Sequence, residues 1–288
     1  MKTSIYRINA PAKINIRLKV TGRRPDGYHE LVSIMVPVDL FDELELKVPF
    51  DGGIKIKSKG FDVPTNEDNL IYRAAESFMS LTGINDGVSM DLNKNIPVAA
   101  GLGGGSSDAA ATLIGLNNLY SNPLSDSDLH TLAVKLGADV PFFINCRPAL
   151  ATGIGEVLES IPKWPHLWYI IITPPFSIST AWVYENLKLE LTIGEYDYIK
   201  SILKNDTYNI SRILENDLEN VTSASFPIIK TLKKLLKDAG AEGAIMSGSG
   251  PSVFGVFSTP DKASAARESL ISKGLGDLFM VRGWQVIP

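Results

Sequence analysis

The chain of 288 residues is 44% hydrophobic and 21% charged, and 28 basic residues against 32 acidic ones give a formal net charge of −4. This composition is typical of a globular protein with one large or two ordinary domains, and the lack of a basic stretch argues against a nucleic-acid or anionic membrane partner. The single cysteine, Cys146, excludes an internal disulfide framework and indicates a reducing compartment. Because there is no leader pattern and no apolar run of about 18 residues, we expect a cytoplasmic protein.

In the first half of the chain, hydrophobic periodicity predicts strands followed by helices. A turn at residues 10–12 separates the first two strands, and a loop covers 22–29. The predicted strands are 4–9, 15–20, 30–38, 43–48, 53–57 and 88–92, with a short one ending at 144. The predicted helices are 70–81 (capped from 66–68), a helix capped by Ser106 or Ser107, and 128–136 capped by Ser125.

In the second half, residues 152–165 are rich in Gly and Pro and mark a boundary between a domain of residues 1–155 and one of 156–288. The predicted strands are 168–173, 243–247, 252–257 and 279–285. The predicted helices are 179–187, 193–203, 213–224, 228–239 and 261–273. Strands and helices do not alternate strictly, so the fold class is α+β.

A glycine-rich stretch directly precedes one predicted helix, with Gly101, Gly103, Gly104 and Gly105 inside five residues. Such a turn leaves the backbone N–H groups of the helix N-terminus open to an anion, which favours phosphate binding. The stretch lacks the Gly-Lys-Ser/Thr of a Walker A loop, and the third small position of a dinucleotide fingerprint is occupied by Ser106 rather than by glycine. A phosphate site here therefore belongs to a third class, and an ordinary glycine turn stays open as the alternative.

Outside that stretch, four side chains are candidates for chemistry. Phosphoryl transfer to an alcohol needs an acceptor for the hydroxyl proton and a cation near the developing charge, and Asp139 and Lys13 are residues of those types. Tyr28 and His29 form a pair suited to stacking on a base and reading its edge. Taken singly, each of these residues is also a common surface or loop residue.

Together these residues resemble the GHMP kinase superfamily, whose three motifs match residues 10–15, 97–107 and 247–251 and so extend over nearly the whole chain. The segments 22–29 and 137–141, with 153–156, are similar to the branch that phosphorylates a cytidine diphosphate conjugate of methylerythritol. The resemblance implies a two-domain α+β GHMP kinase fold. Its N-terminal domain would be ribosomal-protein-S5-like, its C-terminal domain a ferredoxin-like α/β plait, and the substrate cleft would be completed by the second domain.

The resemblance also implies roles for individual residues. Lys13 and Asp139 match the catalytic pair, with Asp139 as the base toward a 2-hydroxyl of the substrate. The positions that match the ATP site are Pro97, Val98, Ala99, Ala100, Gly101, Leu102, Gly103, Gly104, Gly105, Ser106 and Ser107, together with Asn69 and Lys94. The positions that match the substrate site are Asn15, Tyr28, His29, Thr180, Tyr184 and Gly248. ATP and Mg²⁺ are the expected cofactors, and Ser107 is a candidate Mg²⁺ ligand.

Three positions depart from the family pattern. Ala99 and Ala100 stand where relatives usually have at least one further glycine, and Cys146 stands at a position that is commonly glycine. Two other functions stay open: a GHMP kinase for a homoserine-type or mevalonate-type alcohol, and a non-catalytic nucleotide sensor of the same fold. The protein is expected to act as a monomer or a homodimer.

Overall fold

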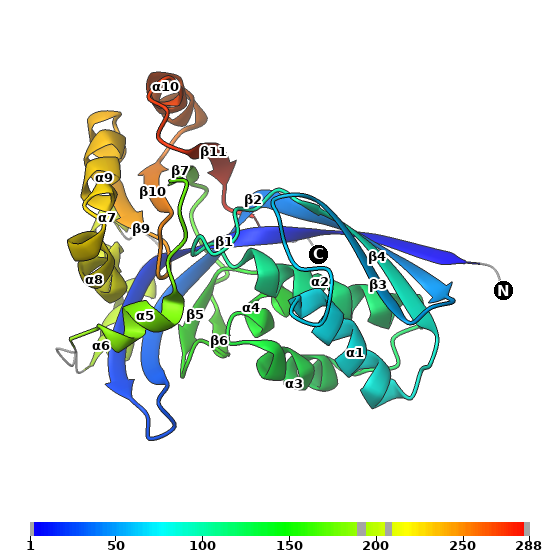
Figure 1. Ribbon diagram of the computed structural model, residues 1–288. Coiled ribbons are helices and arrows are strands. Elements are labelled where there is room, and N and C mark those ends of the chain that lie inside the picture. Colours follow the sequence, from blue (N-terminus) through cyan, green and yellow to red (C-terminus); the bar gives the residue numbers. More distant parts are fainter. Residues whose placement is uncertain (1–2, 189–193, 205–208, 285–288) are drawn as a thin grey trace. The chain divides into compact units, whose positions relative to one another are not determined.

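The computed structural model describes residues 3–188, 194–204 and 209–284, which fold into two compact units, each built from three stretches of the chain (Figure 1). Unit 1 comprises Met1–Ala12, Leu40–Val98 and Gly103–Cys146, and unit 2 comprises Lys13–Asp39, Ala99–Leu102 and Arg147–Pro288. The two longest strands, β1 (Ser4–Arg23) and β2 (His29–Phe50), therefore contribute residues to both units. The division into domains at residue 155 stays a prediction.

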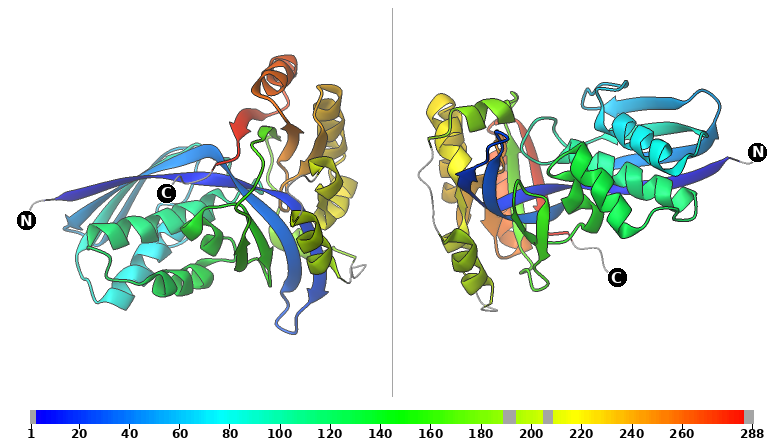
Figure 2. Two further views of the ribbon diagram at one scale, coloured as in Figure 1. Left: turned by 180° about the vertical axis from the view of Figure 1, so that it is seen from behind. Right: turned by 90° about the horizontal axis from the view of Figure 1, so that it is seen from below.

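In unit 1, β4 (Gly87–Lys94) pairs parallel with β3 (Ile54–Gly60) and antiparallel with β2. Alternate residues of these strands are apolar and buried, as in the paired Leu44 and Leu92, so one face of the sheet is built for packing. Helices lie against that face (Figures 1 and 2). They are α1 (Leu70–Thr82), α2 (Gly104–Leu119), α3 (Asp126–Leu136) and α4 (Val140–Asn145).

In unit 2, four antiparallel strands form a sheet in the order β11-β7-β10-β9. Their bounds are β7 Trp168–Thr173, β9 Gly243–Met246, β10 Val253–Phe257 and β11 Asp277–Arg282. The hairpin of β5 (Ala149–Thr152) and β6 (Val157–Ser160) pairs with β2, and β8 (Glu215–Asn216) pairs parallel with β1. The strand order is that of the ferredoxin-like plait.

Four helices of unit 2 pack apolar side chains, with Leu18 and Val20 of β1, into one core on this sheet: α5 (Thr180–Glu185), α8 (Asp217–Ser225), α9 (Ile228–Asp238) and α10 (Pro260–Ile271). Unit 2 also contains α6 (Glu195–Leu203) and α7 (Ile210–Ile213). The α+β class and the plait are thus confirmed. Among the described residues, no helix combines the length and the apolar character that crossing a bilayer requires.

The predicted turn at residues 10–12 is wrong, because β1 runs through it without a break. Ala10 and Ala12 are buried, and no Gly or Asn is present to form a tight hairpin turn. Pro11 is accepted there because this part of β1 has β2 as its one sheet neighbour among the described strands, and proline within sheets is confined to such edge positions. The strands predicted at 30–38 and 43–48 are likewise one strand, β2.

The short strand predicted before residue 144 is wrong, because these residues form helix α4. A short apolar run suits a buried helix as well as a strand, and Pro141 in the first turn presets helical backbone. Residues 152–165 were predicted as a boundary segment, yet they contain most of the β5–β6 hairpin. Their glycines mark the turn of that hairpin.

Three helix starts also differ from the prediction. Asn69, rather than a residue of 66–68, caps α1, and Gly103 occupies the N-cap of α2, whose first turn contains Ser106 and Ser107. The helix predicted at 213–224 is replaced by α7, β8 and α8, because the Asn216 side chain accepts from Leu218 N–H (3.0 Å) and begins a new helix. Residue 193 of one predicted helix and residue 285 of the last predicted strand lie outside the described residues.

Candidate active site

The glycine-rich stretch connects β4 to α2 and leaves the start of that helix open. Gly103 at the N-cap has no side chain, and no side-chain hydrogen bond caps α2. Because Ser106 and Ser107 lie inside the first turn, the first N–H groups of α2 are not occupied by a cap. The positive end of a 16-residue helix is therefore available to an anion.

The middle of the loop is fixed by hydrogen bonds to its backbone carbonyls within unit 2. Ser247 Oγ donates to Gly101 O (2.8 Å), and Lys13 N–H donates to Leu102 O (2.9 Å). Gly101 has φ +76°, and a Cβ at this position would overlap the carbonyl oxygen of Ser247. The motif at 247–251 thus serves as the support of the glycine loop, and Gly101 is required both for its backbone angle and for the close approach.

Two departures from the family pattern lie where glycine is the favoured residue. Ala99 has φ +50°, and Cys146, the C-cap of α4, has φ +45°. A residue with a Cβ is strained in this left-handed region, which is a physical reason for the glycine that the family pattern leads one to expect there. Burial raises the pKa of the Cys146 thiol to about 12, so it is a packing residue and carries no thiolate near neutral pH.

Lys94, predicted to lie near the nucleotide, is buried beneath the start of α2. Its Nζ binds Asp108 Oδ2 (2.7 Å) and the carboxylate of Asp42, and the side chain is 3% exposed. Burial raises the pKa of Asp108 to about 8. The charge of Asp42 also raises this pKa, whereas the ammonium of Lys94 lowers it. Lys94 therefore supports the loop from inside unit 1, and its contact with a nucleotide stays a prediction.

Two buried side-chain oxygens at the same helix start lack a hydrogen-bond partner within the described chain: Ser107 Oγ and Asp108 Oδ1. Oxygen atoms are the ligands that Mg²⁺ prefers, and a nucleotide-bound Mg²⁺ takes one or two of them from the protein. No described group of three or more His, Cys, Asp and Glu residues could hold a metal ion by itself. Ser107 thus fits the ligand role expected of it in a site that the nucleotide completes, and the role stays a prediction.

Lys13 is held by Asn15 in a buried part of β1 in unit 2. Lys13 Nζ donates to Asn15 Oδ1 (2.7 Å), and the two residues are 4% and 2% exposed. Asn15 N–H donates to Ser247 Oγ (3.3 Å), so the first and third motifs meet here. Gly248 follows in the same buried turn, with φ +55°.

Asp139 lies in unit 1, at the N-cap position of α4, and its side chain makes no capping hydrogen bond. The carboxylate is thus not used to stabilise the helix start, which is the ordinary role of an Asp at this place. The predicted catalytic pair is divided between the units, because Lys13 belongs to unit 2.

The residues expected to bind the cytosine belong to unit 2. The rings of His29 and Tyr184 stack, with centroids 5.1 Å apart and planes 25° apart, whereas Tyr28 is 59% exposed. Burial and the neighbouring Arg23 lower the pKa of His29, so the imidazole is neutral at pH 7 and has one donor and one acceptor nitrogen. Thr180 Oγ1 lies 2.8 Å from Ser249 Oγ, which connects α5 to the 247–251 turn.

The side chain of Asn69 is occupied by local hydrogen bonds, and Asn216 is one of two residues with a supporting role that the sequence did not indicate. Asn69 Oδ1 accepts from Ile71 N–H (3.1 Å) and its Nδ2 donates to Pro64 O (2.6 Å), so its side chain is used to begin α1. Asn216 Nδ2 donates to Met246 O (2.9 Å) and Gly248 O (2.8 Å), and thereby holds the third motif. The pattern Asn-Asp-Leu-Glu at 216–219 is a helix-start signal that would have revealed it.

Ser33 is the second residue that the sequence did not single out. It accepts from Asn15 Nδ2 (2.9 Å) and donates to Arg17 O (2.6 Å). The sequence feature that could have indicated Ser33 is its hydroxyl, the one polar side chain within the apolar run 31–38.

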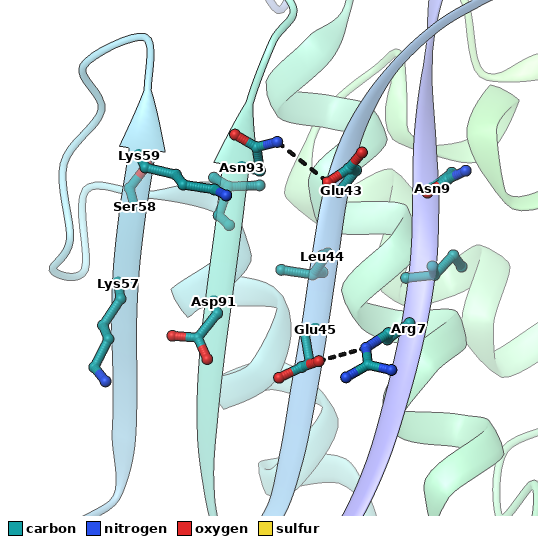
Figure 3. Close-up of a pocket in the computed structure, with 12 residues that line it drawn as sticks. Arg7, Asn9, Glu43, Leu44, Glu45, Lys57, Ser58, Lys59, Asp91 and Asn93 are labelled. Carbon is teal, nitrogen blue, oxygen red and sulfur yellow. Dashed lines mark hydrogen bonds and ion pairs between the residues drawn. The ribbon is translucent and has the colours of Figure 1, made fainter.

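A groove of about 500 Å³ crosses the opposite face of the unit 1 sheet, away from α1–α4 (Figure 3). Its polar and charged side chains pair across neighbouring strands, as Arg7 does with Glu45 (2.5 Å) and Asn93 with Glu43 (3.1 Å). None of the predicted site residues lines it. It is a solvated sheet face rather than part of the candidate site.

The domain descriptions that match the chain are "GHMP kinases N terminal domain" over residues 69–147 and "GHMP kinases C terminal" over residues 198–275. Fold and motifs together therefore define a small-molecule kinase of the GHMP class. Such kinases use ATP as phosphoryl donor.

Similarity to individual proteins narrows the class. A 4-diphosphocytidyl-2-C-methyl-D-erythritol kinase of Geobacter metallireducens is 46% identical over 95% of this chain and 96% of its own length, and that of Syntrophotalea carbinolica is 47% identical over 94% and 96%. A solved structure of 4-(cytidine 5'-diphospho)-2C-methyl-D-erythritol kinase superimposes with a TM-score of 0.81 at 34% identity, covering 97% of this chain and 100% of that one. The chain belongs to the 4-diphosphocytidyl-2-C-methyl-D-erythritol kinase family.

More distant structures share the fold alone. A homoserine kinase from Cytophaga hutchinsonii has a TM-score of 0.77 at 22% identity, and a mevalonate kinase from L. major has 0.73 at 15%. The alternative of a kinase for another small alcohol is therefore not favoured.

Proposed function

We propose that the protein transfers the γ-phosphoryl group of ATP to the 2-hydroxyl of 4-diphosphocytidyl-2-C-methyl-D-erythritol, giving the 2-phosphate and ADP. This is a step of non-mevalonate isoprenoid precursor biosynthesis, and we expect it to take place in the cytoplasm. The observation that carries the proposal is the stack of His29 on Tyr184, since a cytosine needs such a surface and a homoserine or mevalonate does not. Nearly full-length similarity to kinases named for this substrate supports it.

The nucleotide phosphates are assigned to the uncapped start of α2. Its free N–H groups and helix dipole suit the phosphate charge, and Gly101 lets the loop lie against Ser247 so that the backbone is fixed before ATP binds. Mg²⁺ bound to ATP would neutralise part of the phosphate charge, with Ser107 as its protein ligand.

Asp139 is assigned the base. Its carboxylate accepts the proton of the substrate 2-hydroxyl as that oxygen bonds to the γ-phosphorus, and the bond from the γ-phosphorus to the bridging oxygen of ADP breaks. Lys13 is assigned the cation that stabilises the negative charge on the reacting groups. Its anchorage by Asn15, inside a buried strand, supports a role that needs a fixed charge rather than a mobile one.

Cytosine recognition is assigned to Tyr184, His29 and Tyr28. The neutral imidazole of His29 has both a donor and an acceptor, which suits the edge of a cytosine. The exposed ring of Tyr28 supplies a second stacking surface.

An ADP-release assay with purified protein and ATP tests the proposal. We expect turnover with 4-diphosphocytidyl-2-C-methyl-D-erythritol, none with homoserine or mevalonate, and thermal protection by CMP. Turnover of homoserine or mevalonate alone would contradict the substrate assignment. Binding of ATP without ADP release on any of these alcohols would instead identify a nucleotide sensor.

A further inference from the structure

Ser33 on β2 connects the backbone of β1 to the amide of Asn15. Ser33 is 1% exposed, and Asn15 Nδ2 donates to its Oγ (2.9 Å) while the hydroxyl donates to Arg17 O (2.6 Å). All three residues belong to unit 2, as does Lys13. The proposed chemistry gives Ser33 no part, and it contacts none of the reacting groups assigned above.

These hydrogen bonds have only one possible direction. The carbonyl of Arg17 accepts only, so Ser33 must give its single proton to it and offers a lone pair on the other side. Only the NH₂ end of the Asn15 amide can face that lone pair, which turns Oδ1 toward Lys13. An ammonium group donates only, and Oδ1 at 2.7 Å is the partner it requires.

We propose that Ser33 is a positioning residue for the phosphoryl transfer, one that fixes the orientation of the Asn15 amide and through it the place of the Lys13 ammonium. The inference rests on the proposed catalytic role of Lys13. Without the Ser33 hydroxyl the amide loses the hydrogen bond that fixes its NH₂ end, and only its bond to the ammonium remains, so the amide and the ammonium can shift together. The charge is displaced although no residue in contact with substrate has been changed.

The kinetic test compares Ser33→Ala with Ser33→Thr, which keeps a hydroxyl and suits a strand. Loss of one such hydrogen bond predicts a fall in kcat of about tenfold for Ser33→Ala, with the KM for ATP within about twofold of the wild type. Ser33→Thr should recover most of the lost kcat. Thr259→Ala, which removes the cap of α10 in the same unit, is the matched control for general destabilisation and should keep the wild-type kcat.

A double-mutant cycle separates positioning from packing. In a Lys13→Met background, Ser33→Ala should lower the residual kcat by less than about twofold, because the group it positions is gone. An equal loss in both backgrounds would overturn the inference.

Chemical labelling of Lys13 tests the inference without requiring turnover, so it separates a failure of the inference from a failure of the proposed function. The rate at which an N-hydroxysuccinimide ester labels Lys13, followed by peptide mass spectrometry, should rise several-fold in Ser33→Ala and stay at the wild-type value in Ser33→Thr and Thr259→Ala. Unchanged labelling in Ser33→Ala refutes the inference even if kcat falls. Raised labelling in a protein that does not phosphorylate the cytidine substrate would instead place the failure in the proposed function.

Discussion

Lys94 Nζ lies 2.7 Å from Asp108 Oδ2 in the interior of unit 1, and the same ammonium binds Asp42. All three side chains are at most 3% exposed, so their charges are poorly solvated. Two carboxylates and one ammonium would leave a net negative charge in the interior. Because burial raises the pKa of Asp108 to about 8, the cluster holds a proton and is neutral at physiological pH.

This relationship predicts that folding stability falls as pH rises. Between the unfolded pKa near 3.8 and the folded pKa near 8, folded Asp108 binds a proton that the unfolded chain does not, so unfolding becomes easier with each pH unit. Urea unfolding at pH 5 and pH 8 should show that the wild type loses on the order of 4 kcal/mol relative to Asp108→Asn, which cannot ionise. Asp128→Asn is the control, because hydrogen bonds to Ser125 lower the pKa of that exposed carboxylate, which then titrates below this range. Parallel pH curves for the wild type and Asp108→Asn would contradict the assignment.

The sequence predicted most elements because periodicity and caps are local. The stripe of α1 and the cap of α3 at Ser125 are confirmed. Apolar runs were harder, since Val140-Pro-Phe-Phe suits a buried helix or strand equally until Pro141 is placed in the first turn. The continuity of β1 through Pro11 depends on its sheet neighbours, which no local pattern contains.

The candidate site shows the same limit. Motifs indicated Lys13, the glycine loop and the Tyr28–His29 pair, because their residue types suggest chemistry. Ser33 and Asn216 act through hydrogen bonds to residues distant in the chain or to backbone carbonyls, so their role becomes visible only in the fold. Lys94 is the opposite case. Its position in the family pattern predicted a contact with the nucleotide, whereas in the fold its ammonium binds the buried carboxylates of Asp42 and Asp108.

Asp139→Asn should abolish most of the catalysis without abolishing ATP binding. Loss of a general base lowers kcat on the order of 10²–10⁴-fold, whereas the phosphate loop is unchanged. Steady-state kinetics and calorimetry with a non-hydrolysable ATP analogue measure the two effects. Asp126→Asn, a carboxylate in the first turn of α3, is the matched control and should keep wild-type kcat. A kcat for Asp139→Asn within tenfold of the wild type would mean that another group takes the proton.

Tyr184→Leu should weaken binding of the cytidine substrate and leave ATP unaffected. The ring of Tyr184 stacks on His29, and a base–aromatic stack is worth about 1–3 kcal/mol, so we expect KM for the substrate to rise by about 5- to 150-fold. Tyr184→Phe keeps the ring and should stay within about threefold of the wild type. Equal CMP protection in thermal-shift measurements of the wild type and Tyr184→Leu would show that the base binds elsewhere.

Gly101→Ala should damage the phosphate loop far more than a comparable substitution at Gly83. Both glycines have positive φ, +76° and +71°, so both variants carry the backbone strain of roughly 1 kcal/mol that a Cβ causes there. At Gly83, the C-cap of α1, a Cβ would meet no heavy atom within 4 Å, and the strain is the whole effect. At Gly101 the Cβ would also overlap the Ser247 carbonyl, so the loop must move away from the turn that supports it.

We therefore expect Gly83→Ala to lower only the free energy of unfolding. Gly101→Ala should lower the free energy of unfolding and also lower kcat/KM for ATP by at least about tenfold. If the two variants lose the same stability and both keep wild-type kcat/KM, contact with Ser247 does not hold the loop in its binding conformation.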